Sequence, residues 1–463
     1  MAKSKVVFVC KECTYESPKW MGKCPECDNW NTFEERSVQP KKASNKSGVR
    51  VFESSATIKK LSEVVATNSD RIVTSINEFN RVMGGGIVRD SITIITAKPG
   101  AGKSTLLLQV ASDISSNGMK VLYASGEESD SQIRNRAGRI LKVINDNIWV
   151  ISTTSMDSVV SAVNEIDPDL IIVDSIQTFT LDEYLPSRAG SPTQTMECAS
   201  ELLRIAKDRI RPRAVFLVGQ MNKNEEIAGL RSLEHLVDTV LVIEGDSDEE
   251  LRSLIATKNR FGSTGEMGFF SMTEEGMMSI DNPSEFFMTK REEGCEAVGT
   301  ALTAIREGSR PIILEIESLV SNSFMPYPSR ICESIGRDQL NTLISILEQR
   351  GYMNMANKNV VLKTTGGLRL REAAINLCTI MSIASSIKEV AISSDTVFIS
   401  DVGLTGELKK VPSLEARLKE VDRMGFKKAY IAKGSILRKI KFSSLKVIEC
   451  KNLMEVIQDV FNG

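Results

Sequence analysis

The chain has 463 residues, of which 41% are hydrophobic and 25% charged, so it can bury several cores and is neither disordered nor a small disulfide-stapled scaffold. Its 58 basic and 60 acidic side chains give a net charge of −2, which excludes a strong overall field toward nucleic acid and leaves local patches to meet any anionic partner. No apolar run reaches the roughly 20 residues of a membrane-spanning helix and the N-terminus lacks a signal-peptide pattern, so we expect a cytoplasmic protein with no membrane partner.

Four of the nine cysteines fall in one short N-terminal segment, as two C-x2-C pairs separated by ten residues. Two such pairs let four thiolates converge on a single ion, and sulfur ligands favour zinc. Two alternatives compete: redox-active pairs, which usually accompany a βαβ unit that the pattern lacks here, and disulfides, which the cytosol disfavours. The spacing predicts a structural zinc module over residues 1–33, with the ligands Cys10, Cys13, Cys24 and Cys27.

The composition changes twice behind the cysteines. Residues 34–60 are polar and carry seven Lys or Arg against three Asp or Glu, which predicts a solvated linker, with a nucleic-acid contact as the alternative. Residues 286–463 mix strand and helix patterns, which predicts a separate α/β domain. Over residues 61–285, β-branched runs alternate with helical or turn stretches, which predicts a mainly parallel sheet covered on both faces; the runs lie at 91–97, 120–125, 170–175, 214–220 and 239–245.

A glycine-rich loop follows the first of these runs and leads into an amphipathic helical segment. Glycines let backbone N–H groups turn toward phosphate oxygens, and the helix N-terminus adds the positive end of its dipole. In this pattern Lys103 reaches the β- and γ-phosphates of ATP and Ser104 ligates Mg²⁺, while Ala97 departs from the glycine expected there. The predicted nucleotide-binding loop consists of Ala97, Lys98, Pro99, Gly100, Ala101, Gly102, Lys103, Ser104 and Thr105.

Two acidic positions that follow buried strands are candidates for the same site. Asp174 ends the run at 170–174 and is expected to hold Mg²⁺ through water. Glu127 follows the run at 120–125 and is the favoured residue to orient the attacking water, with Glu128 left open as the alternative. The string SGEES at 125–129 would also suit a helix N-cap with acids in its first turn.

The order of these motifs resembles the RadA (Sms) family of bacterial DNA repair proteins over essentially the whole chain. The cysteine module precedes GKST, SGEES, LEHLVDTVLVIEGD at 233–246, KNRFG at 258–262 and NPSEFF at 282–287. The resemblance implies a RecA-like ATPase core that assembles as a DnaB-like hexameric ring on single-stranded DNA. It also implies branch migration of recombination intermediates during homologous recombination, with RecA as a partner. The C-terminal domain would resemble the Lon protease domain and serve as a scaffold and DNA-binding element.

The basic residues Lys258 and Arg260 of KNRFG are candidate catalytic residues beside Lys103 and Glu127. A cation that reaches the γ-phosphate bound by a neighbouring subunit would couple hydrolysis to subunit movement. The same side chains could instead hold DNA phosphates, or form a basic turn before an edge strand.

Two other functions compete with a DNA-dependent ATPase that moves along DNA. One is an ATP-gated clamp that binds DNA or RecA without translocating. The other is a Lon-type peptidase. The sequence argues against it, because Ala373 stands where the resemblance places the nucleophilic serine and Glu415 where it places the base lysine.

The loop at 220–231 departs from the family pattern as well, and it resembles the DNA-binding loop of RecA-like proteins.

Overall fold

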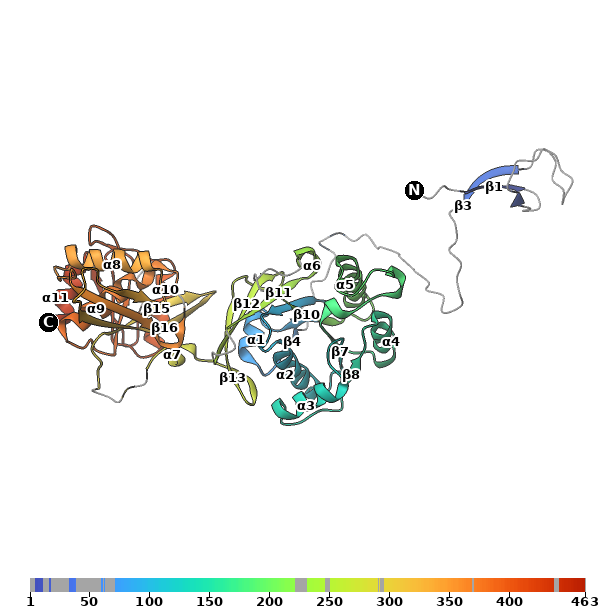
Figure 1. Ribbon diagram of the computed structural model, residues 1–463, viewed down its shortest axis with the longest axis horizontal. Helices are drawn as coiled ribbons and strands as arrows, with labels where there is room; N and C mark the ends of the chain where they lie inside the picture. Colours follow the sequence, from blue (N-terminus) through green and yellow to red (C-terminus); the bar gives the residue numbers. More distant parts are fainter. Residues whose placement is uncertain are drawn as a thin grey trace. The chain divides into compact units, whose positions relative to one another are not determined.

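The structure is a computed structural model of the chain (Figure 1). It describes residues 5–10, 16–17, 33–38, 60, 62, 71–220, 231–245, 250–289, 291, 295–368, 370–436 and 441–462. The chain separates into two compact units, Met1–Ala66 and Thr67–Gly463. The finer division predicted from the sequence, with boundaries at 33, 60 and 285, stays a prediction.

The first unit contains a three-stranded antiparallel sheet in the order β2-β1-β3. Its strands are β1 (Lys5–Cys10), β2 (Glu16–Ser17) and β3 (Phe33–Val38), and Cys10 pairs with Phe33 in the register. Residues 34–38, which the polar composition assigns to the linker, thus belong to a strand, because pairing with β1 supplies the hydrogen bonds that the local sequence does not predict.

The second unit begins with a nine-stranded sheet in the order β14-β13-β12-β11-β6-β10-β9-β7-β8. Neighbours from β11 to β8 pair in parallel and those from β11 to β14 antiparallel, so the sheet is mainly parallel. All five predicted runs are strands. The strands are β6 (Ile92–Ala97), β7 (Val121–Ser125), β8 (Ile148–Ser152), β9 (Leu170–Asp174), β10 (Ala214–Gln220), β11 (Thr239–Glu244), β12 (Leu251–Asn259), β13 (Met267–Thr273) and β14 (Gly276–Ser279), with the two-stranded pair β4 (Arg71–Ile72) and β5 (Ile87–Val88) beside them.

Alternate residues of each parallel strand enter two different cores, because successive side chains of a strand point to opposite faces. In β9, for example, Ile172 faces one core and Ile171 and Val173 face the other. The first core is covered by α1 (Asn77–Val82), α2 (Lys103–Ser116) and α3 (Asp130–Ile140), and the second by α4 (Met156–Ile166), α5 (Pro192–Ala206) and α6 (Arg231–Leu236). Burial on both faces explains the near-continuous apolar runs in the sequence.

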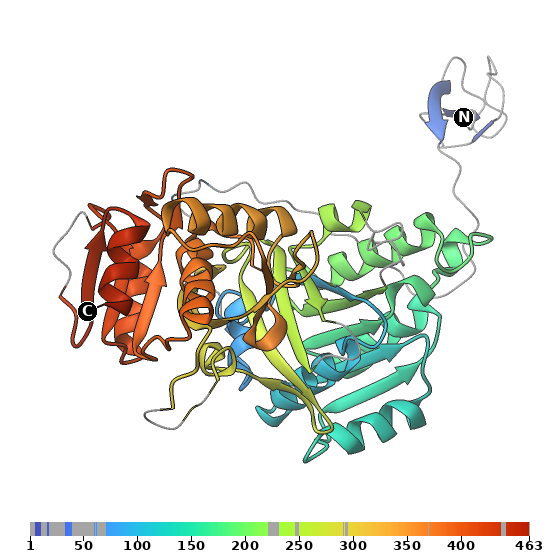
Figure 2. The ribbon, with the colours of Figure 1, turned by 60° about the vertical axis from the view of Figure 1, so that its left-hand side comes forward.

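A second, seven-stranded mixed sheet follows in the order β17-β18-β16-β15-β19-β22-β23 (Figure 2). Residues of α8, α9 and α11 fill the core on one face, and residues of α10 pack in the core on the other. Phe269 of β13 and Phe287 pack edge to face with ring centroids 5.4 Å apart and join the first of these cores. The elements are α7 (Pro283–Phe286), β15 (Thr300–Glu307), β16 (Arg310–Asn322), β17 (Arg330–Cys332), α8 (Arg337–Arg350), β18 (Lys358–Thr364), α9 (Asn376–Lys388), β19 (Thr396–Ile399), β20 (Asp401–Val402), β21 (Leu408–Lys409), α10 (Leu414–Arg423), β22 (Lys428–Ala432), β23 (Lys446–Cys450) and α11 (Leu453–Phe461).

These sheets and helices confirm the predicted α/β class with a mainly parallel core sheet. Among the described residues, no helix is both long and apolar enough to cross a membrane.

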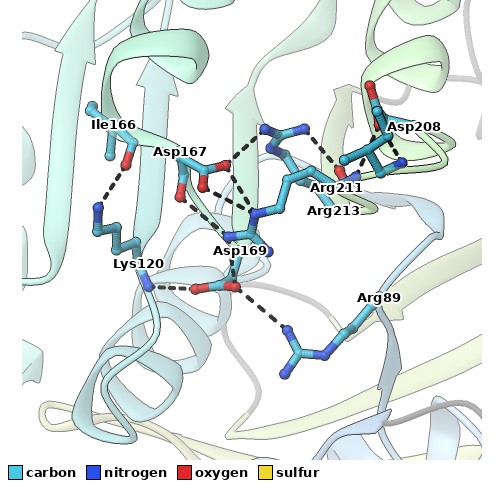
Figure 3. Close-up of polar contacts among 9 residues, drawn as sticks. Arg89, Lys120, Ile166, Asp167, Asp169, Asp208, Arg211 and Arg213 are labelled. Atoms are coloured by element: carbon cyan, nitrogen blue, oxygen red, sulfur yellow. Dashed lines mark hydrogen bonds and ion pairs between the residues drawn. The ribbon is translucent and has the colours of Figure 1, made fainter.

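Ion pairs fix the amino ends of three strands of the first sheet (Figure 3). Asp167 accepts hydrogen bonds from Arg211 Nε at 3.0 Å and from Arg213 at 2.8 Å. Asp169 binds Arg211 at 3.0 Å and accepts the backbone N–H of Lys120 at 2.9 Å. Each partly exposed pair contributes about 1 kcal/mol or less, so the network serves mainly to align the starts of β7, β9 and β10.

One partly buried carboxyl group links folding stability to pH. Glu307 ends β15, and burial together with the nearby carboxylates of Glu372 and Glu244 raises its pKa to about 7, against an opposing effect of Arg371. Because this folded-state pKa lies above the ordinary value of 4.5, the protonated form is favoured in the fold. The contribution of Glu307 to stability is therefore fully present below about pH 4.5 and is lost as the pH rises through about 7.

We expect Glu307→Gln to stabilise the protein at pH 8 by about 1–2 kcal/mol, allowing for the partial exposure of the side chain, and to have little effect at pH 4.5. Thermal unfolding at the two pH values measures this difference. The exposed Glu274→Gln serves as the matched control. An equal effect of Glu307→Gln at both pH values would contradict the assigned pKa.

Candidate active site

The loop between β6 and α2 has the backbone that phosphate binding requires. Gly100 and Gly102 have φ angles of +81° and +102°, which side chains other than glycine rarely adopt. A Cβ on Gly102 would also lie 2.5 Å from Met272 Cε and 2.9 Å from Met277 Sδ, so the two methionine side chains would have to move to make room for it. Gly102 caps α2 without a side-chain hydrogen bond, which leaves the first N–H groups of the helix for an anion.

Ala97 is compatible with this loop because it is the last residue of β6 and its side chain is fully buried in the core under α2. Its carbonyl oxygen accepts a hydrogen bond from Lys103 Nζ at 3.1 Å, so Lys103 lies along the loop. Burial lowers the pKa of Lys103, and the carboxylates of Asp174 and Glu127 act in the opposite direction. Lys103 thus lies within the field of both predicted acidic residues.

Ser104 and Asp174 are in direct contact. Ser104 Oγ donates to Asp174 Oδ2 at 2.6 Å, and the same carboxylate oxygen accepts the Tyr123 hydroxyl at 2.6 Å. Burial and the adjacent Asp174 carboxylate raise the pKa of Tyr123 well above its ordinary value, so its hydroxyl stays protonated and remains a donor. Sequence reasoning missed Tyr123, whose only signal is its place in the strand that precedes Glu127.

The structure distinguishes the two adjacent glutamates. Glu127 Oε1 accepts hydrogen bonds from the hydroxyl of Ser175 and from Gln220 Nε2, the latter at 2.7 Å, so it faces the carboxyl ends of β9 and β10. Glu128 instead pairs with Arg136 of α3.

The string SGEES also contains the N-cap of α3, which is Ser129. Ser129 caps α3 and forms a capping box with Gln132, so neither glutamate is needed as the cap. A Cβ on Gly126 would lie 2.0 Å from Thr178 Oγ1, so the turn that presents Glu127 also requires glycine.

The described part of the site fits magnesium-bound ATP. The strand order β6-β10-β9-β7 brings Lys103, Ser104, Glu127, Asp174 and Gln220 to one edge of the sheet. A hydroxyl and a carboxylate 2.6 Å apart supply the oxygen ligands that Mg²⁺ prefers, and the glycine loop offers N–H groups to phosphates.

Lys258 and Arg260 lie at the other edge of the same sheet. Arg260 pairs with the buried Asp238 at 3.1 Å, and Asp238 accepts the N–H of Ile92, the first residue of β6, also at 3.1 Å. The phosphate-binding loop begins at Ala97, the last residue of that strand, about 17 Å away at the rise of an extended chain. The two basic residues and the phosphate loop of one chain therefore do not meet.

Lys258 makes contacts that the sequence does not predict. Its Nζ donates to the carbonyl oxygens of Glu234 and Val237, the latter at 2.9 Å, so it caps the end of α6. Burial, followed by the nearby Arg260, lowers the pKa of Lys258. Beside these residues lies an open pocket of about 470 Å³, lined by Arg260, Lys207 and the single histidine, His235, among others.

One of the four predicted zinc ligands lies within the described residues. Cys10 ends β1, and Cys13, Cys24 and Cys27 lie outside the described residues, as does most of the loop at 220–231. Within the described residues, no three His, Cys, Asp or Glu side chains group as metal ligands. The other five cysteines are free thiols: Cys198, Cys295, Cys332, Cys378 and Cys450.

Two family models match the parts of the chain that hold the predicted sites. A family model described as an AAA domain matches residues 58–225, which include the phosphate loop and both acidic positions. A model described as a rubredoxin metal binding domain matches residues 8–35, which include all four N-terminal cysteines. The chain thus has an ATP-binding domain and a metal-binding ribbon.

Similar whole proteins carry one name. The chain is 42% identical over 466 residues to the DNA repair protein RadA of Bacillus subtilis (strain 168), covering 100% of both chains. It is 41% identical over 437 residues to that of Listeria monocytogenes serovar 1/2a, covering 94% of both, and 39% identical over 458 residues to that of Halalkalibacterium halodurans, covering 99% of both. Since these identities extend over nearly the whole of each chain, the protein belongs to the RadA family of DNA repair proteins.

Proposed function

We propose that this ATP-hydrolysing member of the family is a DNA-dependent ATPase of homologous recombination. It drives branch migration of recombination intermediates in the cytoplasm, with RecA as a partner. It acts as a DnaB-like hexameric ring on single-stranded DNA. The observation that carries the ATPase part is the meeting of the phosphate loop, Ser104, Asp174 and Glu127 at one sheet edge. Its part in DNA repair rests on the family, and its movement on DNA is the proposal.

Each residue at that edge has a distinct role in the proposed reaction. Lys103 and the N–H groups of the loop hold the β- and γ-phosphates. Ser104 and Asp174 would hold Mg²⁺, which, when bound, neutralises charge on these phosphates, and Tyr123 orients the Asp174 carboxylate through their 2.6 Å hydrogen bond. Glu127 orients the attacking water.

Gln220 is the proposed sensor of the γ-phosphate. Its amide donates to Glu127 at 2.7 Å, so it touches the residue that positions the water. It is also the last residue of β10, and it begins the loop at 220–231, which resembles a DNA-binding loop. A change at that loop would therefore reach Glu127 through one side chain. This favours a DNA-stimulated ATPase over a clamp whose hydrolysis ignores DNA.

The place of Lys258 and Arg260 supports action on a neighbouring chain. They lie about 17 Å along β6 from their own phosphate loop, a distance that neither side chain spans. Arg260 is 55% exposed at its side chain, so it is available to a second copy. Head-to-tail contacts between identical chains form a ring when their rotation closes. A hexameric ring in which each Arg260 serves the next phosphate loop follows this logic.

The remaining parts are assigned supporting roles. We propose that the N-terminal ribbon binds zinc through Cys10, Cys13, Cys24 and Cys27 and contacts RecA or DNA. The C-terminal domain is proposed to be a Lon-like scaffold without peptidase activity. The methyl side chain of Ala373 cannot act as the nucleophile, and the Glu415 carboxylate cannot replace the base lysine. Glu415 lies in the first turn of α10, where it pairs with Lys419 at 2.8 Å.

We expect Glu127→Gln to lower kcat for ATP hydrolysis by about 100-fold or more while nucleotide binding is kept, because the amide cannot accept a proton from water. Glu128→Gln is the matched control and should stay near the wild-type rate, since Glu128 pairs with Arg136. Steady-state hydrolysis and fluorescent-nucleotide binding measure the two effects. A large loss in Glu128→Gln with an active Glu127→Gln would reverse the assignment.

We expect single-stranded DNA to stimulate ATP hydrolysis, with Lys103→Ala inactive in its presence and absence. The stimulation should weaken between about 50 and 200 mM salt, because DNA binding releases counterions. The hydrolysis rate measured with and without DNA over this range is the test. An unchanged rate on addition of DNA, in protein that binds DNA, would favour the ATP-gated clamp.

A further inference from the structure

The segment Lys258–Gly262, here called the cation loop, is held from outside its own hairpin. Arg71 NH2 donates to the carbonyl oxygen of Phe261 at 2.7 Å, and Arg71 NH1 donates to those of Met83 and Gly86 at 3.2 and 3.0 Å. One guanidinium group therefore ties the cation loop to the glycine turn that follows α1. All three partners are backbone atoms, so Arg71 fixes the path of the main chain beside Arg260.

Two further contacts join the cation loop to α1. Asn259 Nδ2 donates to the carbonyl oxygen of Val82, the last residue of α1, at 3.3 Å. Gly84 and Gly262 meet backbone to backbone, since a Cβ on Gly262 would lie 2.9 Å from Gly84 Cα. Because no side chain fits between them, a displacement of α1 must displace the cation loop.

The other end of α1 is bound to the C-terminal domain. The buried Glu78 accepts hydrogen bonds from Arg310 at 2.9 Å, from Arg81 at 3.2 Å and from the N–H of Phe269 at 3.0 Å. Arg310 opens β16, so it belongs to the hairpin between β15 and β16. Arg310 and Arg81 thus neutralise the Glu78 carboxylate, which is only 3% exposed. Arg81 also pairs with a second acid, Glu266.

The cation loop begins the turn between β12 and β13. The tip of the β15–β16 hairpin contacts the other end of that turn. Glu266 accepts the N–H of Ser309 at 3.1 Å and pairs with Arg81 at 2.9 Å. A Cβ on Gly308 would lie 2.7 Å from the carbonyl oxygen of Gly265, so the tip and the turn are in close contact. The turn between β12 and β13 is therefore held by α1 at one end and by the C-terminal domain at the other.

We propose that Arg310 is a positioning residue for Arg260: through Glu78 and α1, the C-terminal domain sets the place of the cation loop and hence its reach toward the ATP of a neighbouring chain. Arg71 is the second positioning residue, at the loop itself. This inference rests on the proposed action of Arg260 on a neighbouring chain. The contacts of both arginines are with the elements that hold the cation loop, so both act through the backbone that carries Arg260.

Arg310→Ala and Arg71→Ala in the full chain test this inference. Each should lower kcat by about 100-fold, the loss expected when a catalytic group is misplaced by about 1 Å, with KM for ATP little changed. Arg310→Lys should recover part of the rate. Arg306→Ala is the matched control, because Arg306 lies in the same hairpin and its side chain binds Gly308 and Ser413 of its own domain.

Mixed assemblies separate positioning from loss of folding. A Lys103→Ala chain keeps an intact cation loop, and an Arg310→Ala chain keeps an intact phosphate loop. Equal mixing should therefore restore up to about a quarter of the wild-type rate, since one interface in four then combines both intact halves. The Arg71→Ala chain should behave in the same way, and it leaves the C-terminal domain untouched.

Two results would overturn the inference. One is a wild-type rate in Arg310→Ala and Arg71→Ala alone. The other is no recovery on mixing either variant with Lys103→Ala while Arg260→Ala mixed with Lys103→Ala does recover. The mixture of Arg260→Ala with Lys103→Ala tests the proposed function separately. If its hydrolysis rate does not recover, the proposed action of Arg260 on a neighbouring chain is wrong, and so is the positioning role.

Discussion

The parallel direction of β6, β7, β9 and β10 is the constraint on which the rest of the site depends. Because these strands run the same way side by side, every residue that follows one of them lies at the same sheet edge. The phosphate loop, Glu127, Asp174 and Gln220 come from distant parts of the chain and still meet within hydrogen-bond distance. The same rule sends residues that precede β6 or β11 to the opposite edge. Arg260, bound to Asp238 just before β11, belongs there.

Buried acids carry the connections at that opposite edge. Asp238 holds Arg260, Lys207 and the N–H of Ile92, and Glu78 holds Arg310, Arg81 and the N–H of Phe269. A buried carboxylate without such partners would cost several kcal/mol, so each acid keeps its partners in place. Asp238 thereby fixes the cation loop to the sheet, and Glu78 fixes α1 to the β15–β16 hairpin.

The sequence predicts those features that depend on short segments. Apolar runs predicted five core strands, and glycine spacing predicted the phosphate loop. The strand β8 is not among the predicted runs, although its first four residues are all apolar. It is the edge strand of the sheet, and its side chains are only partly buried or exposed. Residues 34–38 were assigned to a linker because their strand pairing depends on β1, more than 20 residues earlier.

Features that depend on distant partners were not predictable. The sequence favours Glu127 but leaves Glu128 open, and the partners Ser175, Gln220 and Arg136, all distant in sequence or on another element, distinguish the two. The amine of Lys258 donates to the backbone at the end of α6, a contact that no local pattern predicts. The contact of Arg310 with Glu78 joins residues 232 positions apart, and no local pattern marks either one.

In the proposed function, one chain supplies only half of the machinery for hydrolysis, because Arg260 serves the phosphate loop of a neighbouring chain. The most direct measurement is the ATP hydrolysis rate per chain over a dilution series, with molecular mass followed by light scattering. We predict that the rate per chain falls toward zero as assemblies dissociate into single chains. A rate per chain that stays constant down to concentrations at which only single chains remain would contradict it.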